Sequence, residues 1–145
     1  MEQLKKFVDK YFVLLETVLT ISFAAALLLI LYEFKYYKAA INTTTILLAF
    51  LYFLKGMIKQ EDMPSVLELL SFRLQWYSLS IIILGIAYKL TLNEDNQLLI
   101  AGFVINLISL ILITFLFVKK KYKFTAEYYI RSLVFFLVGG LVFIF

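Results

Sequence analysis

Two charged residues, Glu16 and Arg131, stand inside long apolar runs of this sequence. Ionisable side chains inside a membrane are costly and are often functional, as ion pairs or as relays for protons and cations. If both runs enter a membrane from the same side, Glu16 and Arg131 lie at similar depth, and we predict an ion pair or relay between them. In the alternative reading, Glu16 sits about 7–8 Å below the helix end, where it reaches interfacial water or a basic neighbour.

Four uncharged polar residues also lie within apolar runs. Asn106 is near the centre of its run, and Ser109 flanks the same helical face. Thr17 and Thr20 lie one and four residues after Glu16. A buried amide or hydroxyl in a membrane seeks a hydrogen-bond partner on another helix. We therefore predict that these four residues act in polar helix packing.

Catalytic and metal-binding patterns are missing from the sequence. The chain has no histidine and no cysteine, which excludes thiolate nucleophiles, zinc sites of Cys and His, and His-ligated haem. Only Glu16 and Glu127 are acids near membrane depth, so a paired-carboxylate mechanism lacks a partner at like depth. We identify no catalytic residues, no metal ligands and no cofactor, and an enzymatic role is the least favoured one.

Apolar residues dominate the chain and define its fold class. They make up 63% of the sequence, against about 45–50% in an ordinary soluble domain. A membrane-spanning helix needs about 20 apolar residues, and 98–118 contains twenty-one without a charge. We predict an all-α, polytopic helical bundle in a single transmembrane domain, 1–145. Its five spans are expected at 11–32, 39–57, 76–92, 98–118 and 129–145.

The ends of this predicted bundle leave two questions open. The basic start and the apolar run after it resemble a signal peptide, but the run is longer than the ~7–15 residues of such a segment, so we expect an uncleaved first span. The last run has seventeen residues, about 25 Å of helix, which is the short end for a span. We expect it to cross the membrane, and a re-entrant hairpin is the alternative.

The segment 64–75 has a different pattern from the five spans. Polar residues recur at helical spacing along one stripe, and apolar residues cover the rest. The stripe consists of Glu68, Ser71, Gln75 and Ser78. We predict a short amphipathic helix that lies at the membrane interface, or packs under the bundle, and leads into the third span.

Lysine and arginine predict the orientation of the chain. With a cytoplasmic N-terminus and five spans, eleven basic residues lie on the cytoplasmic side and three, Lys35, Lys38 and Lys89, lie on the other. The positive-inside rule favours this arrangement, with the C-terminus on the opposite side of a prokaryotic inner membrane. The densest basic cluster, expected to anchor topology or bind anionic lipids, consists of Lys119, Lys120, Lys121 and Lys123.

These observations predict a small, non-enzymatic multi-pass membrane protein that acts by helix packing. The expected partners are the lipid bilayer, with anionic lipids among its components, and either further copies of the chain or other membrane subunits. Nucleic acid is not an expected partner, because the basic residues flank apolar runs as topology requires. The alternatives are an oligomeric channel or small transporter with a polar pathway between helices and, less favoured, a lipid-modifying enzyme.

Overall fold

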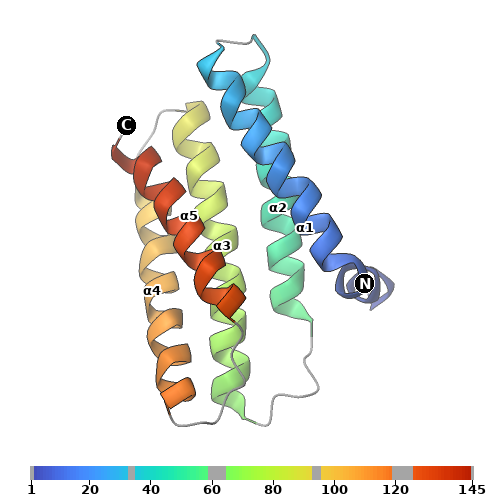
Figure 1. The fold of residues 1–145 in the computed structure, drawn as a ribbon, viewed down its shortest axis with the longest axis vertical. Helices are drawn as coiled ribbons and strands as arrows, with labels where there is room; N and C mark the ends of the chain where they lie inside the picture. Colours follow the sequence, from blue (N-terminus) through green and yellow to red (C-terminus); the bar gives the residue numbers. More distant parts are fainter. Residues whose placement is uncertain (1, 33–34, 59–64, 93–95, 119–125, 145) are drawn as a thin grey trace.

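The computed structural model describes residues 2–32, 35–58, 65–92, 96–118 and 126–144, and these residues form five α-helices without a strand. Figure 1 shows the helices in chain order. They are α1 (Glu2–Leu31), α2 (Tyr37–Met57), α3 (Val66–Leu92), α4 (Gln97–Val118) and α5 (Ala126–Ile144). The all-α prediction is confirmed.

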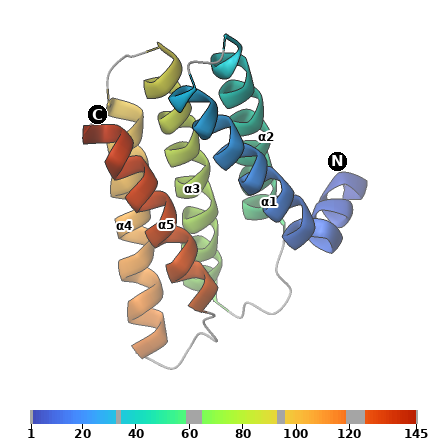
Figure 2. The ribbon, with the colours of Figure 1, turned by 45° about the horizontal axis from the view of Figure 1, so that its top comes forward.

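The helices form two layers with α3 at the centre. Helices α2, α3 and α4 stand in a row, α1 lies across α2, and α5 lies across α3 and α4 (Figures 1 and 2). In the most apolar 18-residue window of α3, 61% of the residues are buried, against 11% in that of α1. Helix α3 is therefore the core of the bundle, and α1 is its most peripheral long helix.

Four helices, α1 to α4, are long and apolar enough to cross a membrane. The apolar part of α5, Tyr129–Ile144, is shorter, and its sixteen residues reach only about 24 Å. The structure therefore indicates a multi-pass membrane protein with four candidate spans. A fifth crossing by α5 remains a prediction.

Helix α3 corrects the prediction of a separate amphipathic helix. Val66–Leu92 is one continuous helix of 27 residues, so the described part of the segment 64–75 forms its first turns. The polar stripe faces the protein interior: Glu68, Ser71, Gln75 and Ser78 are all buried. Val66 and Leu70 point outward instead. In a membrane the surroundings are apolar, so polar side chains that need partners are placed inside the bundle.

Two glycines allow α3 and α4 to approach closely. A Cβ atom added at Gly85 would lie 2.9 Å from the backbone nitrogen of Leu99, and one added at Gly102 would lie 2.7 Å from Cγ1 of Ile82. Side chains at these positions would therefore force the two helices apart. The same pair of helices carries part of the buried polar network described below.

Candidate functional site

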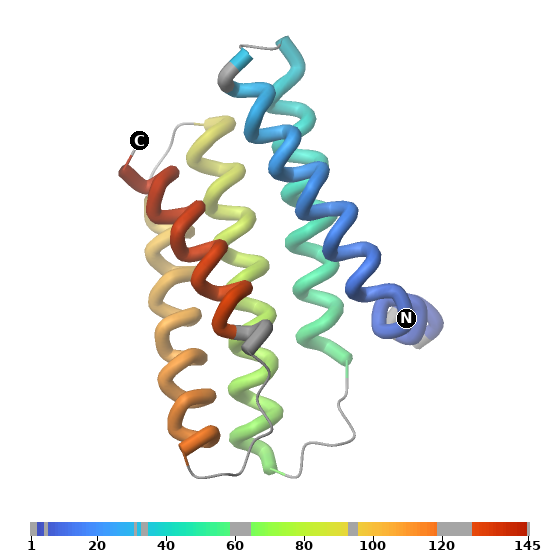
Figure 3. Tube along the Cα trace, in the orientation of Figure 1, coloured from blue at the N-terminus to red at the C-terminus, as the bar shows by residue number. Residues whose placement is uncertain are grey.

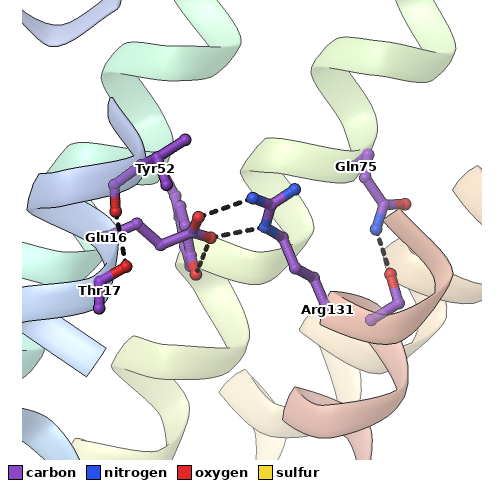
Figure 4. A network of polar contacts seen from close by, with 7 residues as sticks. Glu16, Thr17, Tyr52, Gln75 and Arg131 are labelled. Carbon is purple, nitrogen blue, oxygen red and sulfur yellow. Dashed lines mark hydrogen bonds and ion pairs between the residues drawn. The ribbon is translucent and has the colours of Figure 1, made fainter. Parts of the chain in front are cut away.

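Glu16 and Arg131 form a bidentate ion pair between α1 and α5. The Nε of Arg131 donates to Oε1 of Glu16 at 2.6 Å, and its Nη2 donates to Oε2 at 2.7 Å (Figure 4). The side chain of Arg131 is only 19% exposed and that of Glu16 only 13% exposed. The structure thus brings together the two residues for which the sequence predicts an ion pair. Bidentate, charge-assisted bonds of this kind are among the strongest in proteins.

Tyr52 and two aromatic rings complete the surroundings of this ion pair. The hydroxyl of Tyr52, on α2, donates to Oε1 of Glu16 at 2.9 Å (Figure 4). The guanidinium carbon of Arg131 lies 5.5 Å from the ring centroid of Trp76 and 5.8 Å from that of Phe12. Aromatic faces stabilise a cation at this range. We call Glu16, Arg131, Tyr52, Phe12 and Trp76 the ion-pair site.

Sequence reasoning missed the three aromatic members of the ion-pair site. Tyr52 lies within an apolar run, where its hydroxyl needs a hydrogen-bond partner once it is buried. That requirement is a usable signal in the sequence. In the structure Tyr52 is 1% exposed and its hydroxyl is bonded to Glu16. Phe12 carries no comparable signal, since the chain has 15 phenylalanines, whereas Trp76, the sole tryptophan, has an indole N–H that offers the same kind of signal as the Tyr52 hydroxyl.

A second set of polar residues joins α3, α4 and α5 inside the bundle. Gln75 donates through Nε2 to Oγ of Ser132, and Oγ of Ser109 donates to Oε1 of Gln75 at 2.7 Å. Asn106 donates through Nδ2 to Oγ of Ser78 at 3.0 Å. All five side chains are almost completely buried. We call them the amide network.

The predicted packing residues therefore fall into two groups. Asn106 and Ser109 belong to the amide network. Thr17 and Thr20 lie on α1, beside the ion-pair site, and line a groove. The hydroxyl of Thr17 is satisfied within its own helix, because it donates to the carbonyl of Val13 at 2.7 Å. Gln75 and Ser78 belong to the stripe expected at the membrane interface or under the bundle, and the structure places them inside it with Ser132.

A groove with a volume of about 430 Å³ separates α1 from α5. Among the described residues, no Cα atom of α1 comes within 8 Å of one in α5, so the ion pair bridges two helices whose backbones do not pack together. Glu16, Thr17, Thr20, Tyr52 and Arg131 line one end of the groove. The walls beyond them are apolar and continue to Leu27 and Val138.

The predicted basic cluster, Lys119, Lys120, Lys121 and Lys123, lies outside the described residues. A different lysine, Lys55 in the last turn of α2, forms an ion pair with α1. Its Nζ lies 2.6 Å from Oδ1 of Asp9. Together with the hydrogen bond from Tyr52 to Glu16, this ion pair attaches α1 to α2 at two positions along the helices.

Within the part of the chain that the structure describes, no three His, Cys, Asp or Glu side chains come together as metal ligands would. Glu16 is engaged by Arg131 and Tyr52, and the amide network consists of neutral groups. The arrangement is suited to holding helices together in an apolar medium. Comparison with known protein families, with curated proteins and with solved structures finds no match to the chain.

Proposed function

We propose that this protein is a non-enzymatic multi-pass membrane component that acts by helix packing and forms a symmetric homodimer through the open face of α1. The observation that carries the proposal is the low burial of α1, which packs its backbone only against α2. The ion-pair site and the amide network join helices within the chain, and the exposed face of α1 is largely apolar.

The open face of α1 is an apolar strip on one side of the helix. Its exposed residues recur at helical spacing and are Leu14, Val18, Ile21, Ala25 and Leu28. From Leu14 to Leu28 this face runs about 21 Å along the helix, and half the surface of a cylinder 10 Å wide and this long is about 330 Å². A standard interface buries about 800 Å² per partner, so the contact that we propose is a small one. Two copies of α1 related by an axis along the membrane normal would keep the same orientation in the membrane.

The absence of cysteine from the chain makes this proposal simple to test. We expect Ala25→Cys, on the open face of α1, to form a disulfide-linked dimer in membranes under mild oxidation. The matched control is Ala101→Cys, at an exposed position on α4, which should stay monomeric. Native mass spectrometry of the unmodified protein should report two copies. A monomer in that measurement, with equal cross-linking of both variants, would rule out the dimer.

We further propose that the N-terminus is cytoplasmic, the C-terminus lies on the opposite side, and the membrane is a prokaryotic inner membrane. The support is the distribution of lysine and arginine. The similar course of α1 and α5, which both rise from the lower right to the upper left in Figure 3, also supports it. Topology reporters fused to each end should give opposite signals. Equal signals would contradict five crossings.

The two alternatives receive less support. A channel would need its polar residues along one path, but Asn106 is fixed in the amide network, Thr20 lines the groove, and Asn42 is exposed on α2. A lipid-modifying enzyme that uses Glu16 would need its carboxylate available, and that group is engaged by Arg131 and Tyr52. Electrical conductance in reconstituted bilayers would support the channel hypothesis. Lipid turnover that is lost in Glu16→Gln would support the enzyme hypothesis.

A further inference from the structure

The groove between α1 and α5 has the size of a chain-like ligand. Its volume is about 430 Å³, whereas a spanning helix 30 Å long and 10 Å wide fills about 2,400 Å³. From Glu16 to Leu27 the groove runs along twelve residues of α1, which are eleven helical steps or about 16 Å. That length is close to half of the ~30 Å hydrocarbon core, which is the thickness of one leaflet. A whole partner helix is therefore too large for the groove, and a single hydrocarbon chain fits.

The polar groups of the groove are gathered at its end nearer the starts of α1 and α5. Arg131 and Thr20 carry N–H and O–H groups at this end, and Leu27 and Val138 mark the apolar end. A phospholipid has the same polarity along its length: its ester oxygens accept hydrogen bonds near the membrane surface, and its chains continue toward the midplane. The groove runs along the helices, as a lipid chain in the same leaflet would.

We propose that one acyl chain of a bilayer phospholipid occupies this groove, with its ester region against the ion-pair site. The lipid belongs to the leaflet in which α1 and α5 begin. It fills the space left between two helices whose backbones do not touch, and it gives the apolar side chains on both walls the contacts that neighbouring helices supply elsewhere. Glu16 and Arg131 then limit how far the chain's polar end enters the bundle.

Trp76, the sole tryptophan, is a built-in probe for this lipid. It is 1% exposed, so other side chains shield it from the surrounding bilayer. Its ring lies 5.4 Å from the ring of Tyr52 and 5.5 Å from the guanidinium carbon of Arg131, measured to ring centroids. Both of these residues line the polar end of the groove. A bromine atom on a chain inside the groove would therefore come near Trp76.

The experiment uses the full chain in vesicles of phosphatidylcholine with brominated acyl chains. We expect quenching of Trp76 fluorescence, strongest when the bromines are on carbons near the ester. Ala24→Phe and Val134→Phe, which fill the groove from its two walls, should lose most of this quenching. The matched controls are Ala101→Phe and Val104→Phe, at exposed positions of α4, and they should keep it.

The opposite result is equally clear. Equal quenching in all four variants would mean that Trp76 senses the bulk bilayer, and the proposal would be wrong. Weak quenching in the wild type would mean that the groove is closed or is covered by a second copy of the chain, which also overturns it. Unchanged Trp76 emission in unbrominated vesicles verifies that each variant is folded. Ala24→Phe and Val134→Phe lie on different helices, so each of them tests the groove by itself. The Ala25→Cys cross-link tests the dimer separately.

Discussion

The ion-pair site and the amide network both connect helices through polar side chains, but they differ in charge and in packing. Both join helices through polar groups in an apolar medium, but the ion-pair site is charged and borders a groove, whereas the amide network is neutral and closed off. The helices around the amide network pack closely, with Gly85 and Gly102 at the contact between α3 and α4. The helices joined by Glu16 and Arg131 do not pack together.

This difference shows what each kind of joint can do. Serine and asparagine are short, so in the amide network they connect helices only where the backbones are already near. Arg131 is longer, and with Glu16 it reaches across a gap that no backbone contact closes. As a consequence, removal of either partner leaves the other charge unpaired in apolar surroundings, which is strongly destabilising.

The largest expected effect comes from breaking the ion pair. Glu16→Gln and Arg131→Gln should each lower the free energy of unfolding by about 3 kcal/mol, because each leaves a buried charge without its partner. The double variant should lose much less than the sum of the two. Unfolding of the protein by SDS in mixed micelles measures all three. Additive losses would mean that the two side chains do not interact.

Removal of the Tyr52 hydroxyl should have the next largest effect. Tyr52→Phe keeps the ring and deletes the donor to Glu16, and bonds to charged groups contribute about 1.5 kcal/mol or more. The same substitution in the Glu16→Gln background should cost less, because the acceptor is then neutral. A comparison of the two backgrounds in the micelle assay tests this, and an equal loss in both would argue against a bond to the carboxylate.

A smaller loss is expected in the amide network. Gln75→Leu should cost about 1 kcal/mol, since single hydrogen bonds in membrane proteins average about 0.6 kcal/mol and Gln75 bonds at both ends of its amide. Asn106→Leu should cost less, because Oδ1 of Asn106 has no partner among the described residues. If Asn106→Leu proved the more damaging change, the hydrogen bonds would be assigned wrongly.

The smallest effect should come from Thr17, which belongs to neither network. Thr17→Val preserves the shape of the side chain and removes only a bond to its own helix. We expect a change in unfolding free energy within about 0.5 kcal/mol. A loss as large as that of Tyr52→Phe would show that the hydroxyl of Thr17 has a partner outside this chain.

The sequence was informative wherever a residue type was unusual for its surroundings. A carboxylate and a guanidinium inside apolar runs pointed to Glu16 and Arg131, and a central amide pointed to Asn106. The helices α2 and α4 begin and end within two residues of the predicted spans. Helix α1 begins nine residues earlier than expected, at Glu2, because a helix continues past the point at which its apolar run starts.

The sequence is less informative about the direction in which a polar stripe of a helix faces. The stripe of Glu68, Ser71, Gln75 and Ser78 has the same periodicity whether it faces water or the interior of a bundle, and only packing of α3 among three neighbours decides between them. The groove could not be predicted at all, because it depends on the distance between α1 and α5. No property of either segment alone encodes that distance.

Arg131 and Ser132 are consecutive on α5, yet they belong to different joints: Arg131 bonds to α1, and Ser132 accepts from Gln75 on α3. Adjacent residues of a helix point about 100° apart, so α5 cannot roll about its axis without breaking one attachment or the other. The helix therefore has a fixed rotational setting. Through Arg131 and Ser132, α5 links α1 to the centre of the bundle, although the backbone of α1 touches neither α3 nor α4 in the described residues.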